Sequence, residues 1–141
     1  MSRKWFSSLA LLATVTLFLT LSSCAFNQHL TSITVSPSGS SITLTGIGQD
    51  LPTQFTALGT YIHPPQTRDI TTTALWSTDT PTIIYMDPNT PGLLHTTGTA
   101  CGSNLGVTAK VYSDPSNPSA GTVVLGTATV NVTFGGGAMC P

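Results

Sequence analysis

Short runs of alternating apolar and polar residues, separated by glycine, proline, asparagine or serine, most restrict how this chain can fold. In residues 105–111 every second residue is apolar, and residues 128–134 repeat the pattern. Successive side chains of a β-strand point to opposite faces, so this spacing predicts strands with one buried face. After residue 24, no segment long enough for a helix has the apolar spacing of an amphipathic helix.

The alternating runs predict an all-β sandwich of about seven short strands. Residues 62–70 contain Pro64 and Pro65 and are expected to form a connection, because proline lacks the N–H that a central strand donates. A polar stretch at 113–121 is expected to connect the last two strands. Besides those two strands, the apolar positions expected on strands are Ile33, Val35, Ile42, Leu44, Phe55, Ala57, Ala74, Trp76 and residues 83–86 and 93–94.

The N-terminus has the layout of an export signal. Arg3 and Lys4 precede an apolar segment from Trp5 to Leu21, and two serines then precede Cys24. This pattern is typical of a lipobox, where a bacterial lipoprotein precursor is cleaved and its new N-terminal cysteine is acylated. The alternative is an uncleaved anchor helix, because the apolar segment approaches the roughly 17-residue lower limit for crossing a bilayer.

The lipobox divides the chain into four parts. We predict a signal peptide over 1–23, a lipidated tether over 24–29, the sandwich over 30–134 and a glycine-rich tail over 135–141. In lipoproteins of organisms with two membranes, a residue other than aspartate after the cysteine favours the outer membrane, and here that residue is Ala25. The predicted location is therefore the bacterial cell envelope, with membrane contact through the N-terminal lipid.

The part after the signal peptide carries few charges. Its cations are Arg68 and Lys110, which stand against five aspartates and no glutamate and leave a formal charge of −3. A nucleic-acid-binding protein needs a basic face that displaces counterions, so nucleic acid is not an expected partner. With Cys24 assigned to lipid, Cys101 and Cys140 remain as an even pair in a compartment where disulfides persist.

The pattern resembles the bacterial Ig-like domain, group 2. The residues that carry the resemblance run over about 30–134 and are Leu30-Thr31-Ser32-Ile33-Thr34-Val35-Ser36-Pro37, Gly48, Phe55, Ala57, Trp76-Ser77-Thr78-Asp79 with the Ile83 strand, Pro91-Gly92-Leu93 and Val107-Thr108-Ala109. The connection at 62–70 and the residues around Cys101 depart from the family pattern. The resemblance implies an immunoglobulin-like antiparallel β-sandwich, with Trp76 in the core and Asp79 capping backbone donors in a turn.

Immunoglobulin strand order has two further consequences. It pairs residues 105–112 with 123–134 at positions summing to about 235, which places Cys101 near the end of the last strand. We expect a Cys101–Cys140 disulfide, the alternative being two reduced thiols. The same order places the N-terminus beside the 62–70 and 113–121 connections, so these should lie near the membrane, and the loops at 78–81 and 98–104 should lie away from it.

Few residues are candidates for chemistry. Tyr61, Tyr85 and Tyr112 are the aromatic residues expected to contact a glycan or protein, although packing at the edge of the core also fits each. The histidines at 29, 63 and 95 show no metal-ligand spacing, and neither a paired-carboxylate nor a serine-nucleophile motif is present. We therefore expect no metal, no cofactor and no catalysis.

The function expected from the sequence is that of a non-catalytic, membrane-anchored Ig-like lipoprotein. It would act as a surface adhesion module, bind an envelope protein or glycan, or take part in an envelope assembly. The alternative is a periplasmic lipoprotein that handles a small ligand or a metal.

Overall fold

The computed structural model describes residues 28–113 and 121–135. Within this part of the chain there are ten strands and no α-helix. The strands are β1 (His29–Ser36), β2 (Ser40–Leu44), β3 (Thr53–Gln54), β4 (Thr56–Ile62), β5 (Gln66–Asp69), β6 (Leu75–Thr78), β7 (Ile84–Met86), β8 (Leu93–Thr96), β9 (Gly102–Tyr112) and β10 (Val123–Phe134).

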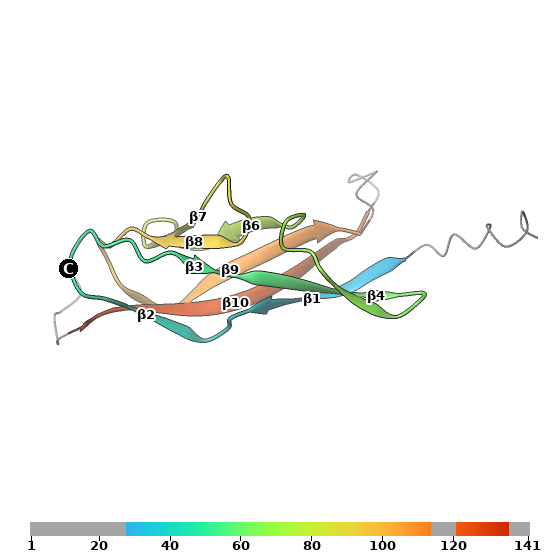
Figure 1. The fold of residues 1–141 in the computed structure, drawn as a ribbon, viewed down its shortest axis with the longest axis horizontal. Helices are drawn as coiled ribbons and strands as arrows, with labels where there is room; N and C mark the ends of the chain where they lie inside the picture. The colour runs from blue at the N-terminus through green and yellow to red at the C-terminus, as the bar shows by residue number, and fades with distance from the viewer. Residues whose placement is uncertain (1–27, 114–120, 136–141) are drawn as a thin grey trace, which may run out of the picture.

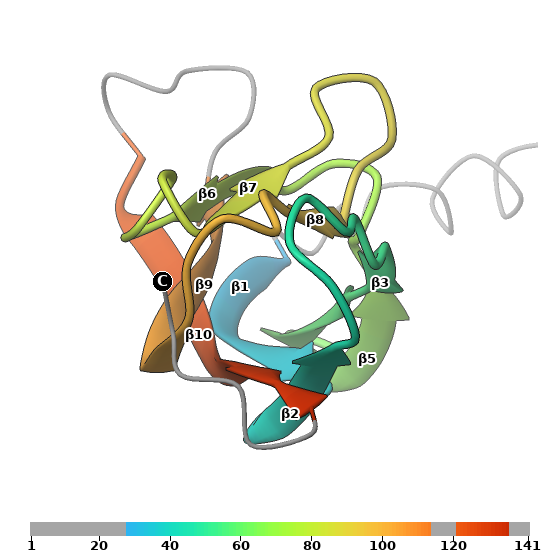
Figure 2. The same cartoon turned by 90° about the vertical axis from the view of Figure 1, so that its left-hand side faces the viewer.

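The strands form two facing layers, as Figures 1 and 2 show. One layer is the four-stranded sheet β2-β10-β9-β6, and the other contains the sheets β1-β4-β5 and β3-β8-β7. Phe55 alone separates β3 from β4, so these two strands act as one strand that joins the two smaller sheets. The fold is therefore an immunoglobulin-like β-sandwich, as the sequence predicts.

The ten strands occupy seven positions of this sandwich plus one addition. The first position is divided: β1 pairs antiparallel with β4 in one layer, and β2 pairs parallel with β10 in the other. The turn between β1 and β2 contains Pro37 and Gly39, and Gly39 has a φ of 71° that favours glycine. The second position is β3 with β4, and β5 is the addition.

The strand β5 corrects one sequence prediction. Residues 62–70 were expected to be a connection, but Gln66–Asp69 pair antiparallel with β4 and only residues 63–65 form the turn. Proline excludes strand structure only where it stands, and both prolines lie in the turn. The residues that follow them are free to form a short edge strand.

The pairing of β9 with β10 follows the predicted register. Val123 lies opposite Tyr112, and Val130 lies opposite Leu105, so paired positions sum to 235. A bulge then shifts the register, and Val132 lies opposite Gly102. This hairpin forms the centre of the four-stranded sheet.

The core lies between the layers and is filled by the inward member of each alternating run. Phe55, Leu44, Ile84 and Leu94 are fully buried, and the two long strands add rows of smaller residues. The buried apolar residues are Leu30, Ile33, Val35, Ile42, Leu44, Phe55, Ala57, Ile70, Ala74, Ile84, Leu94, Leu105, Val107, Ala109, Ala128, Val130 and Val132.

Trp76 lies at the edge of this core, as predicted for a core tryptophan. It is partly buried and packs against the core residues. Its indole N–H donates a 2.9 Å hydrogen bond to the carbonyl of Thr71. The polar atom of the ring is thereby satisfied, while the ring itself contributes apolar contact.

The start of the fold and the β4–β5 turn lie at the same end of the sandwich. His29, the first residue of β1, pairs with Ile62, the last residue of β4. Figure 1 shows this end on the right, together with the start of β10 and the end of β9. The predicted arrangement of the N-terminus beside the 62–70 and 113–121 connections is confirmed for the described residues of these segments.

The packing predicts that truncating a buried leucine lowers the free energy of unfolding much more than truncating an exposed leucine. Leu94 in β8 is fully buried, whereas Leu125 in β10 is 57% exposed. Leu94→Ala should lower the free energy of unfolding by about 2–5 kcal/mol, because it removes buried methyl groups and leaves a cavity. Leu125→Ala should change it by less than about 0.5 kcal/mol. Denaturant titration of both variants measures the difference, and equal losses would contradict the core assignment.

Candidate functional site

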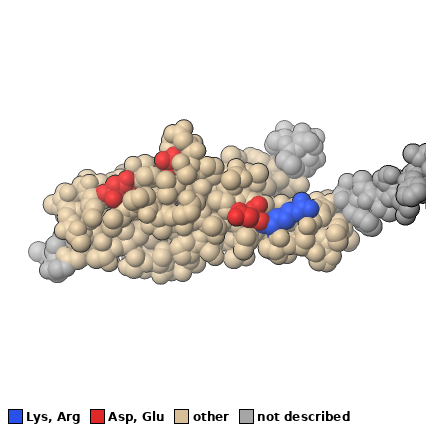
Figure 3. Space-filling model, viewed as in Figure 1, with Lys and Arg blue, Asp and Glu red and all other residues tan. Residues whose placement is uncertain are grey.

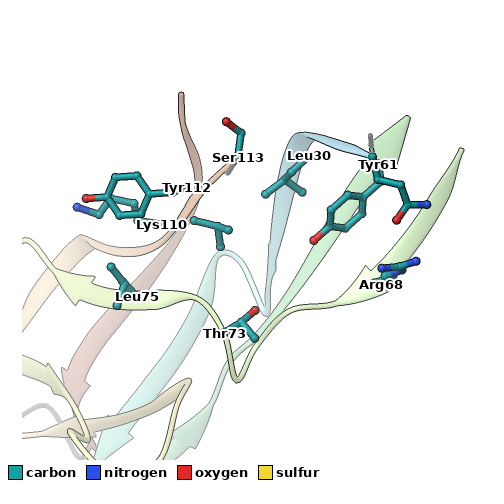
Figure 4. A pocket seen from close by; sticks show the side chains of 10 residues that line it. Leu30, Tyr61, Arg68, Thr73, Leu75, Lys110, Tyr112 and Ser113 are labelled. Atoms are coloured by element: carbon teal, nitrogen blue, oxygen red, sulfur yellow. The ribbon is translucent and has the colours of Figure 1, made fainter. Parts of the chain in front are cut away.

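A pocket of about 650 Å³ opens between the two layers at the N-terminal end of the sandwich. Figure 4 shows Leu30, Tyr61 and Arg68 on one side of it and Leu75, Lys110 and Tyr112 on the other. The remaining lining residues are Gln28, Thr73, Val111 and Ser113. Its volume is within the range of about 300–1,000 Å³ that is typical of small-ligand sites.

Strand pairing positions the two walls. In the first wall Leu30 of β1 lies opposite Tyr61 of β4, and β5 brings Arg68 to the edge of the same sheet. In the second wall Leu75 of β6 lies opposite Lys110 of β9. The pocket therefore depends on β5, the strand that the sequence did not predict.

Each cation of the pocket lies over a tyrosine ring. The guanidinium carbon of Arg68 is 5.5 Å from the centre of the Tyr61 ring, and Nζ of Lys110 is 5.3 Å from the centre of the Tyr112 ring. Such contacts stabilise a cation over an aromatic face by about 0.5–1 kcal/mol at exposed sites. They also hold the long cationic side chains beside the opening.

Two of the three tyrosines predicted as contact residues thus share one site, and the third lies elsewhere. Tyr85 in β7 is 41% exposed and stacks on the His95 ring, with centroids 5.3 Å apart and planes at 15°. This stacking limits the motion of an exposed aromatic side chain. Tyr85 is therefore the predicted contact residue that is presented outside the pocket.

His95 lies between two carboxylates. Its Nδ1 is 2.6 Å from Oδ2 of Asp50, and its Nε2 is 3.4 Å from Oδ2 of Asp87 without an aligned hydrogen bond. The other oxygen of Asp50 accepts the backbone N–H of Thr96 at 3.1 Å. We call Asp50, Asp87 and His95 the Asp–His–Asp cluster.

The contacts of this cluster shift the pKa values of His95 and Asp87. The hydrogen bond to Asp50 raises the pKa of His95, and desolvation opposes this rise. The backbone N–H groups of Asn89 and Thr90 lower the pKa of Asp87. His95 is therefore more readily protonated than a histidine in water, and its positive charge ties the loop before β3 to the β7–β8 turn.

Asp79 lies in the turn after β6, as predicted, and its contacts are specific. Its carboxylate accepts a 2.9 Å hydrogen bond from the hydroxyl of Thr80, and its backbone N–H donates to the carbonyl of Gly106. Among the described residues, no backbone N–H donates to the Asp79 carboxylate, so the capping role that the resemblance implies for Asp79 is wrong. Backbone N–H groups donate instead to Asp87 and to Asp69, which accepts from Thr71.

The three predicted cysteine roles remain predictions. Cys101 directly precedes β9 and packs against the core, and it lines a second hollow of about 530 Å³ with residues of β2, β9 and β10. Cys140 and Cys24 lie outside the described residues, as do the signal peptide and most of the tail. The Cys101–Cys140 disulfide and the acylation of Cys24 are therefore not tested by the structure.

The described residues contain neither a membrane-crossing helix nor a metal site. No helix among them has the length and apolar character that crossing a bilayer requires. No three His, Cys, Asp or Glu side chains in that part of the chain are arranged to hold a metal ion. Of the other histidines, His29 begins β1 and His63 lies in the β4–β5 turn.

A comparison with models of protein families finds no match to this chain, and no curated protein matches its sequence.

Sequence reasoning missed the pocket and the Asp–His–Asp cluster. Arg68 was placed in a loop, and no motif links it to Lys110. Asp50 and His95 are far apart in the sequence and meet because the loop before β3 lies against β8. The one available signal was that Lys110 lies two residues before Tyr112, one of the tyrosines expected to contact a partner.

The cluster predicts that stability falls as the pH rises above about 6.5, through the raised pKa of His95. The folded pKa of His95 is raised, so its contribution is complete below the unfolded pKa of about 6.5 and is lost as the pH rises through the folded pKa. His95→Gln should reduce this dependence of the thermal midpoint, whereas His29→Gln at the exposed start of β1 should preserve it. Parallel pH profiles for the parent and His95→Gln would contradict the role of the cluster.

Proposed function

We propose that this chain is a non-catalytic, lipid-anchored Ig-like lipoprotein of the bacterial cell envelope, similar to group 2 bacterial Ig-like domains, which binds an envelope protein or a glycan. The observation that carries the proposal is that the chain enters the sandwich at one end, and that the pocket lies at this same end. One end holds the start of β1 and the pocket, and Gln28, the first described residue, lines that pocket. The N-terminal side of the chain thus leaves the fold at the pocket end.

The position of Gln28 limits the distance to the proposed anchor. Cys24 precedes Gln28 by four residues, which span at most about 14 Å when fully extended. An acylated Cys24 therefore holds the pocket end against the membrane surface. The opposite end and the sides of the sandwich stay accessible to a partner.

Tyr85 is the residue that we assign to partner contact. Its ring is partly exposed and is held by stacking on His95, which is itself fixed by Asp50. A rigid aromatic side chain provides contact area at a small cost in conformational entropy. This favours Tyr85 as a contact point for a protein or for the face of a sugar ring.

The pocket supports the small-ligand part of the alternative function. It has an adequate volume, and apolar, aromatic and cationic side chains converge on it. The described residues give no such support to metal handling. A ligand in this pocket is compatible with an anchored binding module, because Tyr85 is not one of the residues that line the pocket.

The first test concerns the anchor. In the parent protein, the intact mass of the purified chain should correspond to cleavage before Cys24 and to added acyl groups, and the protein should sediment with membranes. Cys24→Ala should lack the acyl mass. A mature parent protein that begins at Cys24 without acyl groups would contradict the proposal.

The second test concerns the partner. A photo-reactive phenylalanine analogue in place of Tyr85 should form a discrete cross-linked product in intact cells, which mass spectrometry then identifies. The matched control carries the same analogue in place of Thr127, an exposed residue on the outer side of β10. Equal products from both positions would show that Tyr85 is not a specific contact residue.

A further inference from the structure

The cations that follow the signal peptide are gathered at one site. Arg68 and Lys110 both line the pocket. Of the described aspartates, Asp69 follows Arg68 in β5, whereas Asp50 and Asp87 lie in the Asp–His–Asp cluster and Asp79 lies in the turn after β6. On the face shown in Figure 3, the basic atoms lie near the N-terminal end, beside one acidic group, and other acidic atoms lie farther along the molecule. Both cations after residue 23 therefore lie at the N-terminal end of the sandwich.

Neither cation is neutralised by a carboxylate in the described part of the chain. The ion pairs found there all involve His95, so no described carboxylate oxygen lies within 4.0 Å of the charged nitrogens of Arg68 or Lys110. The nearest acid in the sequence, Asp69, accepts a 2.8 Å hydrogen bond from the N–H of Thr71. Both positive charges are therefore available to an anionic ligand.

The rest of the lining indicates an amphipathic ligand. Leu30, Leu75 and Val111 provide apolar contact, and Tyr61 and Tyr112 provide aromatic rings with polar hydroxyl groups. Figure 4 shows the ring of Tyr61 directed into the space between the walls. A bare inorganic anion would leave most of the 650 Å³ unfilled and would not contact these apolar groups.

Exposed aliphatic side chains surround this region. Leu75 is 56% exposed, and Lys110 lies opposite both Leu75 and Leu125, which is 57% exposed. Val123, opposite Tyr112, is 48% exposed. Cations, tyrosines and aliphatic residues together are the composition that favours the interface between water and a lipid bilayer.

We propose that this pocket binds the headgroup of an anionic phospholipid in the membrane that anchors the chain. Arg68 and Lys110 attract the phosphate, while Leu30, Leu75 and Val111 contact the glycerol and the first acyl carbons. The choice of a membrane lipid rather than a soluble anion rests on the proposed acylation of Cys24, which brings the pocket end to the bilayer. The bound lipid then fixes the orientation of the sandwich on the membrane.

Native mass spectrometry of the full chain, purified in detergent, tests this proposal. The probes are phosphatidylglycerol, phosphatidylcholine and inorganic phosphate. We expect one phosphatidylglycerol molecule to bind, with weaker retention of phosphatidylcholine and of inorganic phosphate. Arg68→Gln and Lys110→Gln should each weaken phosphatidylglycerol binding about fivefold, and the double variant about 30-fold, the effect expected for loss of one and two basic residues near an anionic surface.

Three control variants separate the pocket from general charge effects. Arg68→Lys and Lys110→Arg keep the charge and should bind within about twofold of the parent. Ser38→Asp, in the exposed turn between β1 and β2, makes the same change in net charge as Lys110→Gln and should not affect binding. An unchanged thermal midpoint in the double variant shows that the fold is intact.

Two outcomes would overturn the proposal: equal phosphatidylglycerol binding by the parent and a folded double variant, or stronger retention of inorganic phosphate than of phosphatidylglycerol. The intact mass at Cys24 distinguishes this failure from failure of the anchor. An acylated chain whose lipid binding ignores Arg68 and Lys110 refutes the pocket and leaves the anchor in place. A chain without acyl groups that binds phosphatidylglycerol through both cations refutes the anchor and supports the pocket.

Discussion

The pairing of β9 with β10 is the interaction on which the rest of the structure depends. These are the longest strands, and their inward residues, which include Val107, Ala109, Val130 and Val132, form much of the core. At one end the hairpin carries Lys110 and Tyr112 into the pocket, and at the other it places Cys101 beside β2 and β10. A shift of one residue in this register would turn every inward side chain outward. The register therefore determines the core and the composition of both ends.

Most of the fold could be predicted because the core obeys a local rule. Alternation in a strand depends only on neighbouring residues, and it located the main strands. The register of the last hairpin was predicted from the immunoglobulin strand order that the family resemblance implies. The strand β5 was not predictable in this way, because Gln66–Asp69 contains no apolar residue and follows two prolines. It forms because the turn at 63–65 returns the chain along the free edge of β4.

The candidate site was less predictable, because its members are joined by packing between distant segments. The sequence identified Tyr61, Tyr85 and Tyr112 as contact residues without separating them, whereas the structure places two in the pocket and one on the Asp–His–Asp cluster. The role of Thr96, which is buried, could not be predicted from the sequence either. Its hydroxyl accepts the N–H of Leu51 and donates to the carbonyl of Gln49, which fixes the loop that carries Asp50. No local pattern indicates that a threonine in β8 has this role.

This chain has few charged residues. The positions of those residues therefore determine the charge near the pocket more than the net charge does. In a chain with many charged residues, two cations near one opening would be an ordinary feature of the surface. In this chain Arg68 and Lys110 are the only arginine and lysine residues after residue 23, and strand pairing brings both to one pocket. The formal charge of −3 over residues 24–141 would by itself predict repulsion from an anionic membrane. The field near a surface is screened over about 8–10 Å. In the proposed anchored orientation, the charges at the pocket end, which are Arg68, Lys110 and Asp69, therefore act on the membrane more strongly than charges farther along the sandwich.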